Sequence, residues 1–230
     1  MTQTAVILAA GMGTRLGRPW PKPLTPLSDG RTIMRQQVDN LTKAYGDELR
    51  IMTVIGFKLE LIIESFPNNL YVYNEAYDQT NTNRSLLKAL RLSGPGGVLW
   101  MNGDVVFDPR VLDRVQEYID RDESFVCVNT ATVGEEEVKY RVDSSGLISE
   151  LSKQVVDALG ESVGINFVAD KDKANLIAGL AACEDGDYFE RGIEITIEKN
   201  STKFIPIDIS DLYAVEVDFE EDLTRANSHL

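Results

Sequence analysis

A glycine-rich turn near the N-terminus is followed by two cationic side chains. Gly11 and Gly13 come directly after the uncharged segment 5–10, and glycine lets the backbone bring its N–H groups close to a ligand. Consecutive N–H groups in such a turn form an anion-binding concavity, and Arg15 and Lys22 place fixed positive charge beside it. We therefore expect this loop to bind phosphate groups.

Carboxylates follow further apolar segments of the chain. Asp104 comes after the apolar segment 98–101, and Glu216 and Asp218 fall on one face of an extended segment because side chains alternate. Two carboxylates about 4 Å apart repel by about 4 kcal/mol at an effective dielectric constant of about 20, unless a cation lies between them. Such oxygen ligands suit Mg²⁺. The alternative is structural: Asp104 and Asp218 could cap the helices that follow them, the latter with Glu221.

The spacing of the glycines excludes two common nucleotide-binding motifs. A Walker A loop requires Gly-Lys-Ser/Thr, and a dinucleotide-binding fingerprint requires G-x-G-x-x-G at the start of a helix. Gly11, Gly13 and Gly17 instead give G-x-G-x-x-x-G, and prolines at 19, 21 and 23 prevent a continuous helix. A nicotinamide-dependent oxidoreductase is therefore disfavoured. A Ser–His or Cys–His mechanism lacks a base, because His229, next to the end, is the only histidine in the sequence.

Length, charge and cysteine content indicate an enzyme rather than a nucleic-acid-binding protein. The 230 residues suit a single domain spanning 1–230, and the formal net charge of −14 disfavours nucleic acid, which needs a basic surface. The sequence lacks an apolar run of membrane-spanning length and a signal-peptide pattern, so we expect no membrane association. Cys127 and Cys183 suggest neither a disulfide framework nor a zinc site, and we expect a cytoplasmic location.

The elements that position these residues alternate along the chain. Strands are predicted at 49–55, 70–73, 98–101 and 125–129, and helices after Thr32, at 59–66, around 86–90 and after Pro109. This order predicts an α/β fold with a doubly wound, mostly parallel sheet, and ligands at the carboxyl ends of its strands. From residue 139 the period shortens, which predicts a β-hairpin (140–142 and 147–151) within an insertion at 139–168. The rest is predicted as helices near 171–182 and 188–199, strands near 204 and 214, and a terminal helix.

Three segments of the loop carry a more specific pattern. Leu8-Ala9-Ala10-Gly11, Gly13-Thr14-Arg15-Leu16 and Pro21-Lys22-Pro23-Leu24 resemble the signature of the sugar-1-phosphate nucleotidylyltransferases and their short relatives, the phosphocholine- or phosphonate-type cytidylyltransferases. The closing segment 213–223 is similar to that of the phosphocholine-type enzymes. The resemblance spans essentially the whole chain and implies the Rossmann-like nucleotidyltransferase fold.

The resemblance also implies roles for individual residues. Arg15 and Lys22 are expected to be catalytic, and Asp104 and Asp218 to hold Mg²⁺, with Glu216 as an adjacent candidate ligand. The implied nucleotide-binding residues are Leu8, Ala9, Ala10, Gly11, Gly13, Thr14, Arg15, Asn81, Ser85 and Asn102. Asn81 could read a cytosine edge because its amide both donates and accepts hydrogen bonds, but capping of its own loop is an equal alternative.

The insertion 139–168 is expected on the acceptor side. The candidate acceptor-binding residues are Lys139, Arg141, Lys153, Glu161 and Arg191. The cations among them suggest a second anionic group on the acceptor, whereas a trimethylammonium group would need an aromatic cage. Aromatic residues that could supply a cage, but fit the core equally well, are Trp100, Tyr140, Phe167, Tyr188 and Phe189. Lys153 could equally be plain surface, and the acidic run 135–137 is expected on the solvated surface.

Together these residues predict a Mg²⁺-dependent nucleotidyltransferase. A phosphate or phosphonate oxygen of a small anionic acceptor would attack the α-phosphorus of a nucleoside triphosphate, with CTP favoured, and pyrophosphate would leave. An ionised phosphate needs no general base, which agrees with the lack of an internal histidine. The alternatives are a sugar-1-phosphate nucleotidylyltransferase that uses UTP, dTTP or GTP, and a non-catalytic nucleotide-binding regulatory module. A homodimer is compatible with the enzyme prediction.

Overall fold

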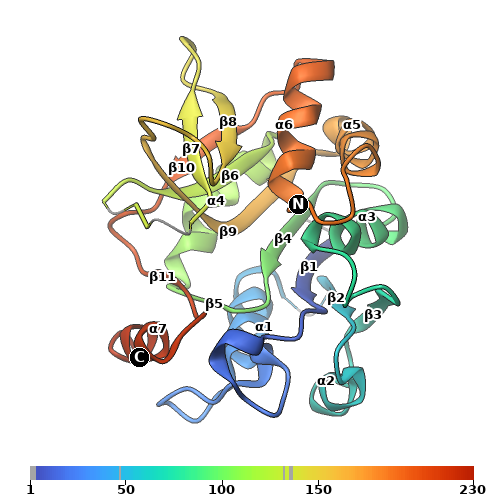
Figure 1. Ribbon diagram of the computed structural model, residues 1–230, viewed down its shortest axis with the longest axis vertical. Coiled ribbons are helices and arrows are strands. Elements are labelled where there is room, and N and C mark those ends of the chain that lie inside the picture. Colours follow the sequence, from blue (N-terminus) through green and yellow to red (C-terminus); the bar gives the residue numbers. More distant parts are fainter. Residues whose placement is uncertain (1–3, 47, 132, 135–136) are drawn as a thin grey trace.

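A mixed β-sheet forms the centre of the computed structural model, which describes residues 4–46, 48–131, 133–134 and 137–230 (Figure 1). Its main path runs in the order β10–β6–β9–β4–β1–β2–β3. The bounds are β1 (Thr4–Ala9), β2 (Arg50–Ile55), β3 (Leu70–Tyr73), β4 (Val98–Asn102), β6 (Phe125–Asn129), β9 (Gly160–Val168) and β10 (Ile205–Asp208). Neighbours along this path are parallel except where β9 pairs with β4 and β6. The predicted α/β fold with a mostly parallel sheet is confirmed.

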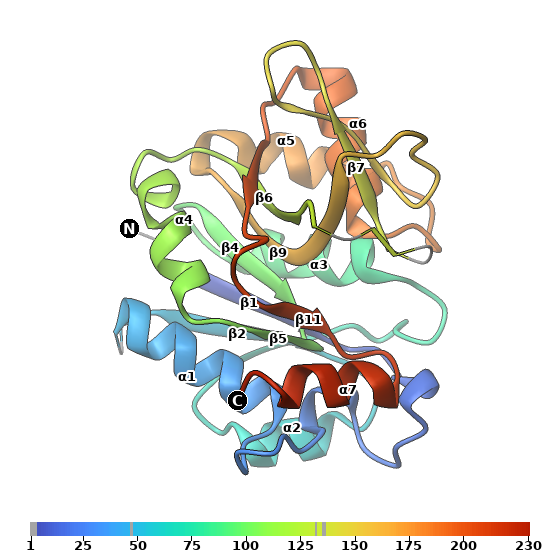
Figure 2. The ribbon, with the colours of Figure 1, turned by 90° about the vertical axis from the view of Figure 1, so that its left-hand side faces the viewer.

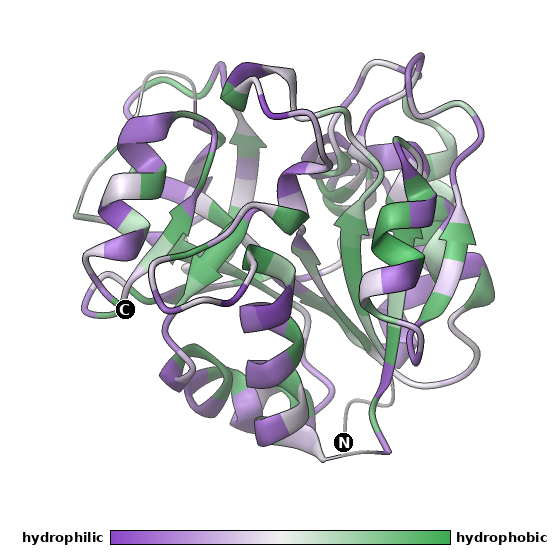
Figure 3. Ribbon diagram, turned by 90° about the horizontal axis from the view of Figure 1, so that it is seen from below, coloured by the Kyte–Doolittle hydropathy of each residue, from purple (hydrophilic) through white to green (hydrophobic). Residues whose placement is uncertain are grey.

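Helices cover both faces of the sheet because successive side chains of a strand point to opposite faces. The helices are α1 (Ile33–Tyr45), α2 (Leu59–Ser65), α3 (Thr82–Leu92), α4 (Arg110–Asp120), α5 (Asp170–Ala181), α6 (Phe189–Asn200) and α7 (Glu220–Asn227). On β1, Ala5 and Ile7 share a buried cluster with α1, α2 and α4, whereas Val6 and Leu8 share one with α3, α5 and α6. Figure 3 shows largely hydrophobic strands between helices of mixed character. No helix in the described parts of the chain is long and apolar enough to cross a membrane.

Local signals set where several helices begin. The Thr32 hydroxyl accepts a hydrogen bond from the backbone N–H of Arg35 at 3.2 Å and caps α1, as predicted. Pro109 directly precedes α4, where a missing N–H costs nothing. Asn81 caps α3, because its side-chain oxygen accepts from the N–H of Thr82 at 2.8 Å.

A small ribbon closes the sheet on the side of the C-terminus. β5 (Val105–Phe107) pairs antiparallel with β11 (Ala214–Glu216). Helix α7 packs against this ribbon through Leu223 and Ala226. Figure 2 shows this helix in red beside β5 and β11. The ribbon therefore brings residues near 216 back to the turn that follows β4.

The segment 139–168, predicted as an insertion, divides into two parts. Its hairpin forms as expected from β7 (Lys139–Val142) and β8 (Ile148–Ser152). Strand β9, however, lies inside the central sheet between β4 and β6, so an insertion ending at 168 is wrong. Ser162, Gly164 and Asn166 interrupt the apolar run of β9, and a strand buried on both faces was therefore not recognisable from its pattern.

Candidate active site

The glycine loop leaves the carboxyl end of β1 and continues through two short 3₁₀ turns, η1 (Thr14–Leu16) and η2 (Lys22–Leu24). Gly13 adopts φ +59°, and a Cβ atom there would lie only 2.8 Å from the Cβ of Lys22. A side chain at this position would therefore displace Lys22. Gly11 faces open space at the cleft described below. The loop thus brings exposed backbone and a lysine to the same side of the site.

The Lys22 ammonium lies between two carboxylates that are far apart in the sequence. Nζ donates to Oδ2 of Asp104 at 2.8 Å and also to Oδ1 of Asp218. Burial lowers the pKa of Lys22, but the charges and hydrogen bonds of the two aspartates outweigh it and hold the pKa above its ordinary value. For Asp218 the directions are reversed: burial raises its pKa, but the charges and hydrogen bonds of Lys22 and Arg15 outweigh burial and hold the pKa below its ordinary value. The site therefore holds a fixed cation beside an ionised aspartate at neutral pH.

Asp104 and Asp218 both contact Lys22, and neither caps a helix. Asp218 also accepts from Nη1 of Arg15 at 2.8 Å. Helix α7 is capped by Asp222, whose Oδ2 accepts from the N–H groups of Phe219 at 2.8 Å and Asp218 at 3.1 Å. Asp104 precedes strand β5 and not a helix. The capping alternative is therefore wrong for both residues.

The two aspartates also offer the kind of oxygen atoms that Mg²⁺ binds. Oδ1 of Asp104 is buried without a hydrogen-bond partner among the described residues, so this oxygen is available to a ligand. Among the residues that the structure describes, no group of three or more His, Cys, Asp or Glu side chains is placed to hold a metal ion by itself. The pair fits a cation that takes its remaining ligands from substrate oxygens and water, as Mg²⁺ commonly does.

Glu216 belongs to the same cleft but has a different partner. Its Oε1 accepts from Nδ2 of Asn102 at 3.1 Å. Burial, together with the negative charges of Asp104 and Glu137, raises the pKa of Glu216 well above its ordinary value. Gly164, at φ +69°, makes room for this contact, since a Cβ there would lie 2.6 Å from Oε1 of Glu216 and 2.8 Å from Nδ2 of Asn102.

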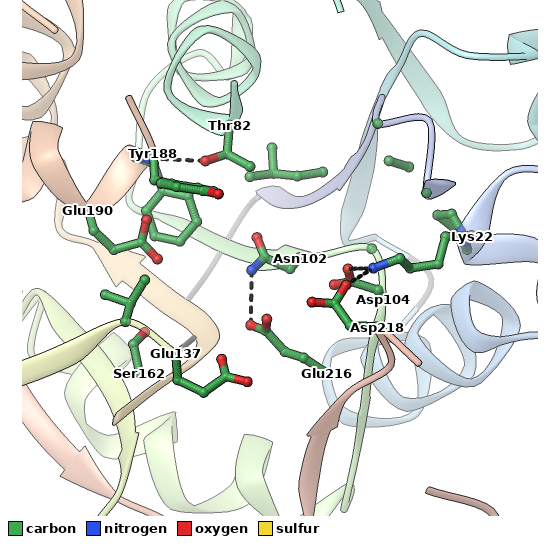
Figure 4. A pocket seen from close by; sticks show the side chains of 18 of the residues that line it. Lys22, Thr82, Asn102, Asp104, Glu137, Ser162, Tyr188, Glu190, Glu216 and Asp218 are labelled. Atoms are coloured by element: carbon green, nitrogen blue, oxygen red, sulfur yellow. Dashed lines mark hydrogen bonds and ion pairs between the residues drawn. The ribbon is translucent and has the colours of Figure 1, made fainter. Parts of the chain in front are cut away.

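These groups line a cleft of about 280 Å³ that continues toward the hairpin and the start of α6 (Figure 4). Lining residues that the sequence did not indicate as functional are Thr82, Glu137, Ser162 and Glu190. The Thr82 hydroxyl accepts from the N–H of Phe189 at 3.0 Å and joins the starts of α3 and α6. Glu137 lines the cleft, so its expected place on the solvated surface is wrong; residues 135–136 lie outside the described part. Ser162 and Glu190 each have an apolar neighbour on one side and a charged neighbour on the other, a pattern that does not distinguish a cleft residue from a surface residue.

The predicted nucleotide-binding residues differ in where they lie. Those that line the cleft are Leu8, Ala9, Gly11, Gly13, Arg15 and Asn102. Thr14 is exposed, and Ala10 and Ser85 are buried outside the cleft lining. Asn81 caps α3, and its Nδ2 donates to the carbonyl of Gly186 at 3.3 Å. The capping alternative is confirmed for Asn81.

One of the candidate acceptor-side residues lines the cleft. Lys153 does so, with Nζ 5.2 Å from the ring centre of Tyr188. Glu161 instead accepts from the backbone N–H of Gly134 at 2.8 Å, which ties it to a neighbouring loop. Lys139 lies on β7, outside the cleft lining.

The two arginines of this set are held by carboxylates elsewhere. Arg141 lies 3.8 Å from Glu150 across the hairpin. Arg191 pairs with Glu194 at 3.1 Å and Glu198 at 3.2 Å, and it lines an adjoining hollow rather than the cleft. Of the four cations in this set, Lys153 is the one that lines the described cleft, because Lys139 and Arg141 lie on β7 and Arg191 lies on α6.

Comparisons with known proteins agree with the fold and the loop. A family model described as MobA-like NTP transferase domain matches residues 5–162. The chain is 37% identical over 120 residues to CMP-5'-(3-aminopropyl)phosphonate synthase of Streptomyces rubellomurinus, which covers 48% of this chain and 18% of that protein. It is 25% identical over 232 residues to bifunctional protein GlmU of Methanococcus aeolicus, covering 98% of this chain and 54% of that protein. The chain thus spans about half or less of the length of these relatives.

A solved structure shows that the similarity of fold covers the whole chain. CTP:phosphocholine cytidylyltransferase from Streptococcus pneumoniae superimposes with a TM-score of 0.77 at 16% identity, over 100% of this chain and 99% of that one. The family match includes the glycine loop, Lys22 and Asp104, which meet at the cleft. By this match and by its fold, the chain belongs to the family of MobA-like NTP transferase domains.

Proposed function

We propose that this chain transfers a nucleoside monophosphate from a nucleoside triphosphate to the phosphate or phosphonate group of a small acceptor. The observation that carries the proposal is the Lys22 ammonium, held between Asp104 and Asp218 beside the glycine loop with its side chain 11% exposed. A fixed cation, two carboxylates and exposed backbone therefore surround one point of the cleft. An α-phosphate at this point would meet preorganised positive charge without reorganisation of the protein.

The proposed step is an in-line displacement at phosphorus. An ionised acceptor oxygen attacks the α-phosphorus, the bond to the oxygen that bridges to the β-phosphate breaks, and pyrophosphate leaves with that electron pair. The attacking oxygen carries no proton, so no general base is needed. Lys22 neutralises the charge that grows on the α-phosphate, while Arg15 and the backbone at Gly11 and Gly13 hold the β- and γ-phosphates. Catalysis then depends on position and charge.

Mg²⁺ is part of this proposal, with Asp104 and Asp218 as its protein ligands. When bound, the ion would neutralise phosphate charge and orient the reacting groups. The unpartnered Oδ1 of Asp104 supports this assignment. Glu216 remains a further candidate ligand, although Asn102 holds one of its oxygens.

CTP is the triphosphate that we propose. Support comes from the CMP-linked name of the relative that is 37% identical over half of this chain, and from the CTP-dependent enzyme that shares the fold. A sugar-1-phosphate nucleotidylyltransferase is the second candidate, because carboxylates in the cleft could accept hydrogen bonds from sugar hydroxyls.

Pyrophosphate release tests the proposal. CTP, UTP, dTTP and GTP are each incubated with Mg²⁺ and with alkylphosphonates, aminoalkylphosphonates or glucose 1-phosphate. We expect acceptor-dependent release that is fastest with CTP. Release that requires glucose 1-phosphate with UTP, dTTP or GTP would favour the second candidate. Nucleotide binding without pyrophosphate release from any pair would instead indicate a regulatory module and contradict the proposed function.

A further inference from the structure

The end of the cleft opposite Lys22 has a distinct composition (Figure 4). Glu137, Ser162, Tyr188 and Glu190 gather there, from three segments of the chain: the segment that precedes β7, strand β9 and the start of α6. Lys153 also lines this end, with its ammonium over the Tyr188 ring. If the proposed transfer is correct, the acceptor's phosphate lies near Lys22, and the remainder of the acceptor lies among these side chains.

Glu190 is the most unusual of these residues. It is 5% exposed, lines the cleft from the first turn of α6, and its Oε2 has no hydrogen-bond partner among the described residues. Burial raises the pKa of Glu190 to about 7, which the positive charge of Lys153 opposes and the negative charge of Glu194 reinforces. A buried carboxylate oxygen without a partner is costly, and a ligand that donates to it would remove the cost.

Ser162 provides a second acceptor at the same end. It is 5% exposed, and its hydroxyl oxygen also has no partner among the described residues. Its position is rigid, because it lies within β9 and its backbone N–H donates to the carbonyl of Val138 at 2.7 Å. Two buried oxygens, fixed by a helix and a strand, therefore face the cleft without donors.

We infer that the acceptor carries a primary ammonium group at the end remote from its phosphate or phosphonate, and that Glu190 and Ser162 bind it. This inference rests on the proposed nucleotidyl transfer and names its substrate class: a short aminoalkyl phosphate or phosphonate. The ammonium supplies hydrogen-bond donors for both oxygens and positive charge for the carboxylates of Glu190 and Glu137.

A quaternary ammonium group fits this end of the cleft less well. It has no N–H to offer to Glu190 or Ser162, and it is normally bound by several aromatic faces. Tyr188 offers one face, which Lys153 already approaches at 5.2 Å. Phe189 is 1% exposed and packs edge-on against Trp100 at 5.7 Å between ring centres. The described residues therefore form no aromatic cage here.

A second anionic group on the acceptor also fits poorly. A carboxylate in this position would meet Glu137 and Glu190 together with the cation Lys153, whereas the other described lining cations, Arg15 and Lys22, lie at the glycine-loop end of the cleft. Arg191 is engaged by Glu194 and Glu198. The charge at this end of the cleft therefore favours a cationic substrate group, in contrast to the anionic group expected from the sequence.

Matched acceptors test the inference. Pyrophosphate release is measured with CTP and Mg²⁺ for 3-aminopropylphosphonate, for butylphosphonate, in which a methyl group replaces the ammonium, and for 3-phosphonopropionate. We expect kcat/KM for the amine to exceed the value for butylphosphonate by about 100-fold, with the carboxylate used least. Equal use of the amine and butylphosphonate, or preference for the carboxylate, would overturn the inference.

Two variants assign the effect to Glu190. In Glu190→Gln, the preference for the amine over butylphosphonate should fall to within about 5-fold, mainly through a higher KM for the amine. Glu198→Gln removes a charge from the exposed side of the same helix and should retain the preference. An equal loss on both acceptors in Glu190→Gln would contradict the assignment. If Glu190→Gln does not fold, the comparison of the three acceptors with the unaltered protein still tests whether the site prefers an ammonium group.

The outcomes separate this inference from the proposed function. Release with glucose 1-phosphate but not with the amine leaves nucleotidyl transfer standing and overturns the ammonium site. Absence of release with any triphosphate and acceptor overturns both.

Discussion

Asn102 and Glu216 meet in the middle of the cleft, where Nδ2 of the asparagine lies 3.1 Å from Oε1 of the glutamate. The bond joins β4 to β11 across 114 positions of sequence. Gly164 of β9 lies against it so closely that any Cβ atom would collide with both partners. Strands β4, β9 and β11, which are distant in sequence, therefore hold one another in position between the two ends of the cleft.

Gly164→Ala should therefore damage the site more than the fold. The added Cβ would lie 2.6 Å from Oε1 of Glu216, so the Asn102–Glu216 bond must break or shift. The positive φ of +69° adds about 1–2 kcal/mol of backbone strain. We expect kcat/KM to fall by about 10-fold or more, since a buried polar group left without its hydrogen bond costs about 1–3 kcal/mol.

Gly146→Ala is the matched control for this variant. Gly146 also has a positive φ, +80°, but open space where its Cβ would be. Urea unfolding of Gly146→Ala measures the stability lost to backbone strain alone, and only Gly164→Ala should lose activity. Equal activity of the two variants would show that the Asn102–Glu216 bond is not needed.

Lys22→Ala should lower turnover far more than nucleotide affinity. The ammonium is proposed to act on the charge that develops in the transition state, so its loss should reduce kcat by about 10²–10³-fold with a modest change in the Kd of CTP. Steady-state kinetics and calorimetric titration of CTP check the two quantities separately. Lys203→Ala, at an exposed lysine that does not line the cleft, is the control. Near-normal kcat in Lys22→Ala would remove this residue from the mechanism.

Removal of Lys22 should also change the response to Mg²⁺. Asp104 and Asp218 share this ammonium as a partner, and without it they repel each other and favour a divalent cation. We expect 10 mM Mg²⁺ to raise the Tm of Lys22→Ala by about 2–4 °C more than that of the unaltered protein, which corresponds to about 1 kcal/mol for a chain of this size. Thermal unfolding with and without Mg²⁺ measures this difference. The absence of a Mg²⁺-dependent shift in Lys22→Ala would argue against a metal at these aspartates.

Glu190→Gln should stabilise the protein above neutral pH. Burial raises the pKa of Glu190 from 4.5 to about 7, so the folded state holds this proton more strongly than the unfolded state. Its contribution to stability is fully present below pH 4.5 and is lost as the pH rises to about 7, a change of at most about 3 kcal/mol. The charged groups near it, Lys153, Glu194 and Glu137, remain in the variant.

Urea unfolding at pH 5 and pH 8 measures this effect. Relative to the unaltered protein, Glu190→Gln should gain stability at pH 8 compared with pH 5. Glu198→Gln, whose carboxyl is exposed, should show little dependence on pH. The same difference in stability at both pH values would mean that Glu190 does not titrate in this range.

Much of the sheet and half of the cleft were predictable because they depend on local pattern. Each of these features is recognised from residues that are close together in the sequence: the apolar run of β1, the glycine loop, and the alternating strands and helices after it. Local backbone geometry determines where they form. Strand β9 was not predictable, because its pairing with β4 and β6 depends on partners 32–70 positions away and not on its own interrupted pattern.

The sequence by itself determined that a phosphate-binding loop, a lysine between prolines and distant carboxylates occur in one chain. Only the tertiary structure decided that Lys22 lies between Asp104 and Asp218, and that Asn81 caps a helix. It also decided that the far end of the cleft presents Glu190 and Ser162 rather than Arg141 and Arg191. The physical reason is that charge can be counted along a chain, whereas the direction of a side chain depends on the packing of the elements around it.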